Sequence, residues 1–190
     1  MEDPDLQSLQ LIQQGDEQGL VDLMNSHRDA IFRFTFRFVY NEEDAAELTE
    51  ATFLKVYQNA ARFRPRAKVR TWIFTIAGNL CRDFLRKQRK RKGDISLQTP
   101  LGNEPGFTLL DQLSDRATIP DQEAASQEKL QRIESAIDLL PHKLKLPFVY
   151  CILEGHSYDE CAEIIRSTRK TVETRIYRAR KTLQRELQNS

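Results

Sequence analysis

Apolar residues recur every three or four positions along most of the chain, which is the spacing of amphipathic helices that bury one face. In the first half this spacing predicts helices over residues 6–14, 17–40, 42–61 and 69–91, with a basic loop at 63–68. Four helices of this length can close one small bundle. No stretch alternates apolar and polar residues as a half-buried strand does, so the predicted fold class is all-α.

The helical spacing stops in residues 93–125, which carry several Pro and Gly residues and are mostly acidic where they are charged. This composition predicts an extended linker. Beyond it, one helical stripe ends at Pro141 and a further helix is expected over 146–154. The sequence therefore predicts two small helical domains, residues 1–92 and 126–190, joined by an extended acidic linker.

The end of the chain, residues 157–187, has the pattern of two helices joined by a tight turn near residues 166–168. Ser157 and Glu160 have the spacing of a capping box, which starts a helix. The second helix carries one apolar stripe, made of Val172, Ile176, Ala179, Leu183 and Leu187. This pattern is typical of a helix-turn-helix whose second helix enters a DNA groove, and the alternative is a solvated surface helix.

The net charge of +1 hides a strong segregation of charge along the chain. Residues 1–61 hold 4 Lys or Arg and 12 Asp or Glu, whereas residues 62–92 hold 12 Lys or Arg and 1 acid. A second cationic segment covers the final helix, where Glu173 is the single acid between residues 164 and 185. Two such segments predict two surfaces that face a polyanion, although cations near a helix C-terminus are favourable in themselves.

Aromatic residues lie among the cations of the first basic segment, with Phe63, Trp72 and Phe74 close to it in sequence. Cations for phosphates and ring faces for unstacked bases are what single-stranded nucleic acid binds. Aromatic residues at helical spacing are more often core than stacking platforms, so Trp72 is expected to be at least partly structural.

The three cysteines, Cys81, Cys151 and Cys161, do not have the spacing of metal ligands and are expected to be buried, reduced thiols. Neither a metal site nor a cofactor is expected. The sequence has no signal-peptide pattern and no apolar run of membrane length, so a cytoplasmic location is expected.

Two basic helical modules joined by an acidic linker, in this order, resemble a bacterial sigma factor of the extracytoplasmic-function (ECF) group. Residues 44–57 are similar to region 2.2, which docks on the β′ clamp helices of RNA polymerase, and residues 63–79 to region 2.3, which melts the promoter. Residues 80–92 are similar to region 2.4, which recognises the minus-ten element, and 157–183 to region 4.2, which recognises the minus-thirty-five element.

The resemblance implies three sets of site residues. Those expected at the minus-ten element and the melted strand are Phe63, Arg64, Arg66, Lys68, Trp72, Asn79, Arg82, Asp83, Arg86, Arg89 and Lys90. Those expected at the minus-thirty-five element are Arg169, Lys170, Thr171, Arg175 and Arg178, because recognition helices enter DNA by their N-terminal turns. Those expected to bind polymerase are Asp44, Glu47, Leu48, Glu50, Phe53, Leu54 and Tyr57.

The resemblance also implies partners: core RNA polymerase through its β′ clamp helices and β flap, promoter DNA as duplex and as melted non-template strand, and an anti-sigma factor. The expected function is promoter recognition and melting without catalysis. The alternatives are a helix-turn-helix regulator that binds DNA without polymerase and, further off, a nucleic-acid enzyme. A regulator would need a dimerisation surface, and a nuclease would need clustered carboxylates for metal ions.

The two DNA elements of such a promoter lie roughly 50–60 Å apart along B-DNA, whereas a flexible coil of residues 93–126 spans only about 30 Å. The linker is therefore expected to be held extended in the working complex. Two local departures from the family pattern carry their own expectations. Arg166 stands where the turn commonly has Gly, so it adopts either a left-handed backbone or another turn, and a helix begins or kinks near Pro147.

Overall fold

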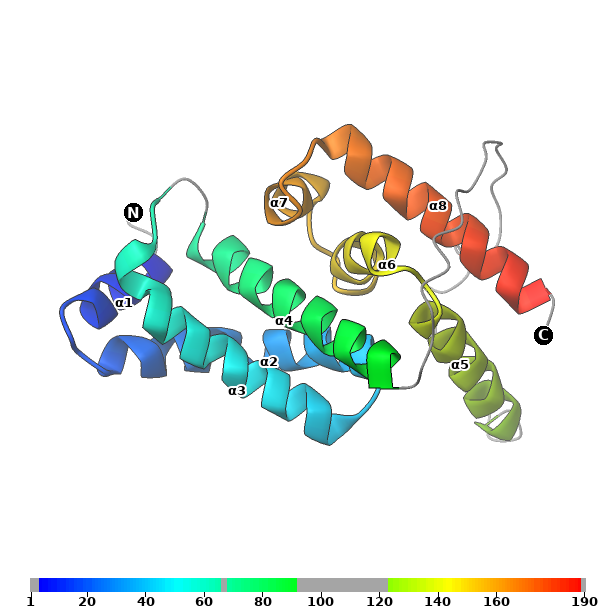
Figure 1. Ribbon diagram of the computed structural model, residues 1–190, viewed down its shortest axis with the longest axis horizontal. Helices are drawn as coiled ribbons and strands as arrows, with labels where there is room; N and C mark the ends of the chain where they lie inside the picture. The colour runs from blue at the N-terminus through cyan, green and yellow to red at the C-terminus, as the bar shows by residue number, and fades with distance from the viewer. Residues whose placement is uncertain (1–3, 66–67, 92–122, 189–190) are drawn as a thin grey trace.

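The computed structural model describes residues 4–65, 68–91 and 123–188, without the side chains of 89–91 and 123–130. All regular structure in these ranges is helical, which confirms the all-α fold class (Figure 1). The N-terminal half contains α1 (Pro4–Gln13), α2 (Gln18–Val39), α3 (Glu42–Asn59), η1 (Ala60–Arg62) and α4 (Val69–Arg91). The C-terminal half contains α5 (Glu123–Asp138), α6 (His142–Phe148), the π-helical turn η4 (Val149–Leu153), α7 (Tyr158–Ile164) and α8 (Arg169–Gln188).

The N-terminal half is a bundle in which α2, α3 and α4 pack around a common apolar core and α1 crosses the end of α2 (Figure 1). The crossing of α1 and α2 needs Gly19, because a Cβ at that position would overlap the backbone oxygen of Ser8. Asn41 caps α3 by accepting a hydrogen bond from the backbone N–H of Asp44 at 2.9 Å. Gly19 therefore permits the close packing of α1 on α2, and Asn41 marks the start of α3.

The C-terminal half differs from expectation around Pro147. The predicted single helix over 146–154 was wrong: α6 begins at His142, directly after Pro141, and contains Pro147 near its end. The next turn, Val149–Leu153, is a π-helix. At its end the Glu154 N–H donates to the oxygen of Val149, five residues earlier, at 3.0 Å. Pro147 has no N–H to donate and its ring crowds the preceding turn, so a local change of helical winding is the expected response.

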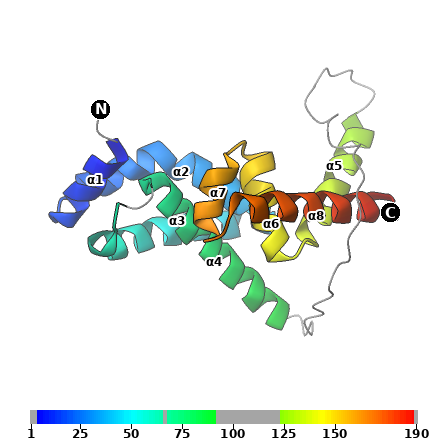
Figure 2. The same ribbon diagram turned by 90° about the horizontal axis from the view of Figure 1, so that it is seen from above.

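The two halves pack directly against each other. The buried apolar residues of both form one continuous cluster, in which the rings of Phe34 and Phe74 meet the edge of Tyr150 at centroid distances of 6.3 and 5.1 Å. Figures 1 and 2 show α6 and α7 lying beside α4 and α2 rather than apart from them. The sequence predicted two separate domains, and the positions of their boundaries stay a prediction. Most of the predicted linker lies outside the described residues, and residues 123–125 belong to α5.

Candidate nucleic-acid interface

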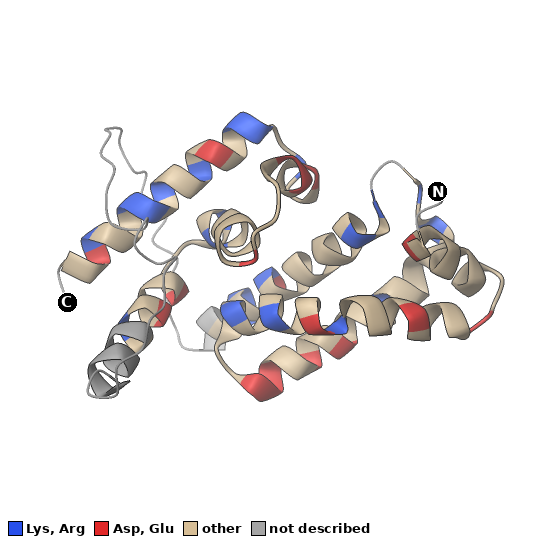
Figure 3. Ribbon diagram, turned by 180° about the vertical axis from the view of Figure 1, so that it is seen from behind, with Lys and Arg blue, Asp and Glu red and all other residues tan. Residues whose placement is uncertain are grey.

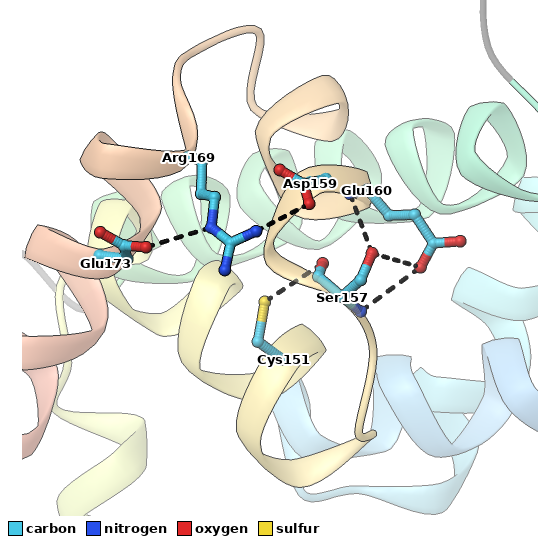
Figure 4. A network of polar contacts seen from close by, with 6 residues as sticks. All are labelled: Cys151, Ser157, Asp159, Glu160, Arg169 and Glu173. Carbon is cyan, nitrogen blue, oxygen red and sulfur yellow. Dashed lines mark hydrogen bonds and ion pairs between the residues drawn. The ribbon is translucent and has the colours of Figure 1, made fainter.

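The helix-turn-helix pattern is formed by α7 and α8. The capping box at the start of α7 is confirmed: the hydroxyl of Ser157 accepts from the Glu160 N–H at 3.2 Å, and the Glu160 carboxylate accepts from the Ser157 N–H at 3.4 Å (Figure 4). Burial works to raise the pKa of Glu160, but the hydrogen bonds from Ser157, with help from Lys68 and Arg70, hold that pKa below its usual range. The carboxylate that caps α7 is therefore ionised and also faces cations of the N-terminal half.

The turn between α7 and α8 is a Schellman motif with an arginine at its left-handed position. Arg166 has a φ of 49°, its N–H donates to the Glu163 oxygen at 3.1 Å, and the Ser167 N–H donates to the Ala162 oxygen at 2.9 Å. This motif usually places Gly at the left-handed residue, because a Cβ there is strained. Of the two expectations for Arg166, the left-handed backbone is the one confirmed.

The helix α8 buries the predicted stripe and exposes Lys170, Arg178, Lys181 and Arg185, whereas Arg175 and Arg180 are partly buried. The stripe packs against the other helices of the C-terminal half. Its buried members are Val172, Ile176, Ala179 and Leu183, and Leu187 is partly buried. Figure 3 shows cations along α8 and at the distal part of α4. The exposed cations of α8 therefore lie on the side of the helix away from its buried stripe.

A groove of about 530 Å³ runs between α8 and the start of α6. Four of the five residues expected at the minus-thirty-five element help to line it: Lys170, Thr171, Arg175 and Arg178. Lys143, Leu144, Thr168 and Thr174 complete the lining. None of these four residues was predicted from the sequence as a DNA contact. Lys143 and Leu144 belong to α6, which begins earlier than the predicted helix over 146–154.

Arg169 differs from the other four residues because its guanidinium is already paired. It donates to Asp159 of α7 at 3.1 Å and to Glu173 of α8 at 3.2 Å (Figure 4). These contacts tie the first turn of α8 to α7, although surface ion pairs of this kind contribute little stability. Two nitrogens of the Arg169 guanidinium, Nε and Nη1, are therefore already engaged with carboxylates in this conformation.

The residues expected at the minus-ten element divide into buried and exposed groups. Phe63 is buried and its ring lies 5.1 Å from that of Trp72, which is partly buried against the core as expected. Arg64, Lys68, Asn79, Arg82 and Arg86 are exposed. Arg66 lies outside the described residues, and the side chains of Arg89 and Lys90 are likewise not described.

Asp83 sits between the two described arginines of the distal part of α4. One of its oxygens lies 3.5 Å from Arg82 and also 3.5 Å from Arg86. All three side chains are substantially exposed, so these pairs are loose and exchange readily for a phosphate. Arg82 and Arg86 share one face of α4 because they are four residues apart in the helix.

The residues expected to bind polymerase lie on α3. Leu54 and Tyr57 are large apolar side chains left 57% and 41% exposed, and Glu47 and Glu50 are exposed close to them in the helix. Asp44 is half-buried in the first turn, where it meets the N-cap. Leu48 and Phe53 are buried in the bundle, so in this conformation they anchor α3 instead of facing a partner.

The described part of the chain was also searched for reactive cysteines, metal sites and membrane-spanning helices. The three cysteines are buried, and burial raises the pKa of Cys81 to about 12, which keeps it a thiol. Among the residues with described side chains, no three His, Cys, Asp or Glu side chains gather as a metal site would require. No described helix is both long and apolar enough to cross a membrane.

Comparisons with known proteins agree over nearly the whole chain. The family model for Sigma-70 region 2 matches residues 23–91, and the model for Sigma-70 region 4 matches residues 130–183. The chain is 28% identical to the ECF RNA polymerase sigma factor SigW of Bacillus subtilis, covering 94% of each chain. It is also 28% identical to the ECF RNA polymerase sigma-E factor of Haemophilus influenzae, covering 93% of this chain and 92% of the relative.

Two solved structures share the fold. CnrH in complex with the cytosolic domain of CnrY superposes with a TM-score of 0.69 at 22% identity, over 99% of both chains. The sigma factor RpoE bound to the anti-sigma factor NepR from Bartonella quintana superposes with a TM-score of 0.59 at 20% identity, over 87% of this chain and 94% of that one.

Proposed function

The chain belongs to the ECF group of the sigma-70 family, and from this premise we propose that it directs RNA polymerase to specific promoters and helps to melt them. It works as a dissociable initiation subunit. It acts by binding, with its own side chains performing no bond chemistry.

One observation carries this proposal: a region 2 module and a region 4 module follow each other in a single chain that aligns end to end with sigma factors. A helix-turn-helix regulator that binds DNA without polymerase would need only the second module. The presence of the first favours the sigma factor over that alternative.

The exposed surfaces support a division of labour. We assign polymerase binding to α3, where Leu54 and Tyr57 expose apolar area beside acids, and this area fits the β′ clamp helices. We assign the minus-ten element and the melted non-template strand to α4 and the loop before it. The groove beside α8 receives the minus-thirty-five duplex, and the C-terminal half meets the β flap.

An anti-sigma factor is a further proposed partner, because one structural neighbour is described as a sigma factor bound to an anti-sigma factor. Promoter DNA and polymerase place the working protein in the cytoplasm. No cofactor enters the proposed activity.

Retention on core RNA polymerase followed by run-off transcription tests the proposal. A pool of promoter fragments serves as template, and sequencing of the transcripts identifies the preferred promoter. The double variant L54A/Y57A should lose retention and transcripts, because both side chains project from α3. The matched control V21A also shortens an exposed apolar side chain, on α2, and should behave as the unchanged protein. Absence of retention by the unchanged protein would overturn the proposal.

A further inference from the structure

The first residue of α8, Arg169, is held by carboxylates from two different helices (Figure 4). Its Nη1 donates to Asp159 of α7 at 3.1 Å, and its Nε donates to Glu173, one turn further along α8, at 3.2 Å. A guanidinium has five N–H donors, and the Nη2 of Arg169 makes no hydrogen bond to the described part of the chain. Some donors of this group are therefore free while others fix its position.

The backbone that carries Arg169 is restrained as well. The hydroxyl of Thr168 accepts from the Thr171 N–H at 3.2 Å, which caps the start of α8, and the Schellman motif at Arg166 precedes it. Because both ends of the Arg169 side chain are restrained, it loses little freedom when it meets a ligand. Such an arginine suits a ligand whose acceptors lie in one fixed geometry.

The charge around Arg169 argues against a phosphate as that ligand. Asp159, Arg169 and Glu173 together carry one net negative charge, and each of their side chains is at least 48% exposed. Phosphate oxygens are repelled by such a cluster, and the exposed cations Lys170 and Arg178 of the same helix attract them instead. The edge of a base carries no net charge, so it can accept from the free donors of Arg169 without this repulsion.

We propose that Arg169 contacts a guanine in the major groove of the minus-thirty-five element, and that Asp159 and Glu173 are positioning residues that set this preference. The N-terminal residues of a recognition helix contact base edges. Guanine presents two acceptors there, O6 and N7, whereas each other base presents at most one. A guanidinium has only donors, so guanine is the base that accepts from two of its N–H groups at once. The inference rests on the proposed function for the identity of the DNA site.

The test recovers DNA through the tagged full chain in the presence of core RNA polymerase and sequences it. The DNA is a pool of duplexes with a randomised segment long enough for both promoter elements, and a reaction without the chain gives the background. The variant D159N keeps the size of the side chain and removes its charge, and R169K keeps the charge and removes the planar fork. The control E163Q neutralises an exposed carboxylate of α7 in the same way.

The unchanged chain and E163Q should prefer guanine about tenfold over the other bases at one position, the discrimination of a good bidentate pair. R169K should lose this preference, because an ammonium cannot be held by two carboxylates and still present a fork. D159N should reduce it by about threefold or more at that position alone. Its affinity for duplexes without the guanine should be equal or higher, because a negative charge is removed. D159E restores a carboxylate and should recover most of the preference.

Equal base preferences for D159N, E163Q and the unchanged chain would overturn the proposal. A loss of affinity in R169K that is uniform over all sequences would overturn it too, since a purely structural clamp between α7 and α8 predicts that result. If D159N loses helical circular dichroism, E173Q carries the same test from α8 and must weaken the same guanine. Absence of retention on polymerase, with a guanine preference that still depends on Asp159, would reject the proposed function and leave the positioning role standing.

Discussion

The amino group of Lys145 in α6 donates a hydrogen bond to the backbone oxygen of Phe38 in α2, 107 positions earlier in the chain, at 2.8 Å. Lys145 is the buried cation of the contact between the halves, while its ion-pair partner Asp138 remains 56% exposed. Because Asp138 stays in water, the hydrogen bond to Phe38 and the packing of the lysine stem carry the contact.

Replacing Lys145 by Met should lower the free energy of unfolding by about 1–3 kcal/mol, because the oxygen of Phe38 loses its side-chain donor in a buried place. Urea denaturation followed by circular dichroism measures the change. K143M, at an exposed lysine two positions earlier, is the matched control and should stay within about 0.5 kcal/mol. Equal stability of the two variants would contradict the role given to Lys145.

Replacing Arg166 by Gly should stabilise the protein by up to about 1 kcal/mol, because the left-handed φ of 49° strains a residue with a Cβ. The gain is reduced by the greater freedom of Gly in the unfolded chain. R166A keeps the Cβ and removes the charge, so it separates backbone strain from electrostatics. Thermal unfolding should rank R166G above R166A, and the reverse order would show that the turn is unstrained.

Acidification should weaken the packing of the two halves against each other through His156. Burial first, and then the positive charge of Arg70, lower the pKa of this imidazole below 6.5, while Glu160 and Glu154 work in the opposite direction and Arg33 adds to the lowering. The unfolded chain therefore binds a proton at a higher pH than the folded one, so stability is complete above about pH 6.5 and falls as the pH drops below that value.

Urea denaturation at pH 7.5 and pH 5.5 measures this dependence, and H156Q is the control. Gln keeps a polar group beside Arg70 but does not titrate, so its loss of stability between the two pH values should be smaller. The contribution of Glu160 does not interfere, because its pKa is lowered from 4.5 and its stabilisation is lost only in more acidic solution. An identical pH dependence for H156Q and the unchanged chain would exclude His156 as the cause.

Replacing Tyr150 by Phe should leave the free energy of unfolding unchanged or raise it by up to about 1 kcal/mol. Among the described residues its buried hydroxyl has no hydrogen-bond partner, and burial raises its pKa above the ordinary value, so the phenol stays neutral. The ring contacts with Phe34 and Phe74 are kept in Phe. A clear loss of stability in urea would reveal a partner for the hydroxyl.

Replacing Lys143 by Ala should weaken promoter binding by the polymerase complex about equally for all sequences and reduce the slope of affinity against salt by about 1. Lys143 lines the groove beside α8 and is exposed, so it is placed to contact the DNA backbone. R132A removes an exposed cation of α5 outside the groove lining and is the control. An equal salt slope for the two variants would remove Lys143 from the interface.

Much of the local structure was predictable because its causes are local. The spacing of Val172, Ile176 and Leu183 predicted the buried face of α8, and the pair Ser157 and Glu160 predicted the start of α7. The error at Pro147 has a local reason as well. A proline is compatible with a helix start, a kink or a change of winding, and the neighbouring contacts decide among them.

The cationic face of the candidate interface was visible in the sequence, but the pairing of its members was not. Arg169 had the position of a base-contacting residue, and only the approach of α7 to α8 brought Asp159 to its guanidinium. Lys143 joined the groove because α6 packs against α8. The charge of a side chain can be read from the sequence. Whether that side chain is free to contact DNA depends on neighbours from elsewhere in the chain.

By itself the sequence determined an all-α chain with two basic helical modules, since periodicity, caps and charge act over a few residues along one helix. Only the tertiary structure decided that the modules close on each other. Lys145 and Glu154 are residue types that usually lie at the surface. They are buried here because their partners in α2 offset the loss of water. Such compensation requires groups more than a hundred positions apart to meet, and no local pattern records that meeting.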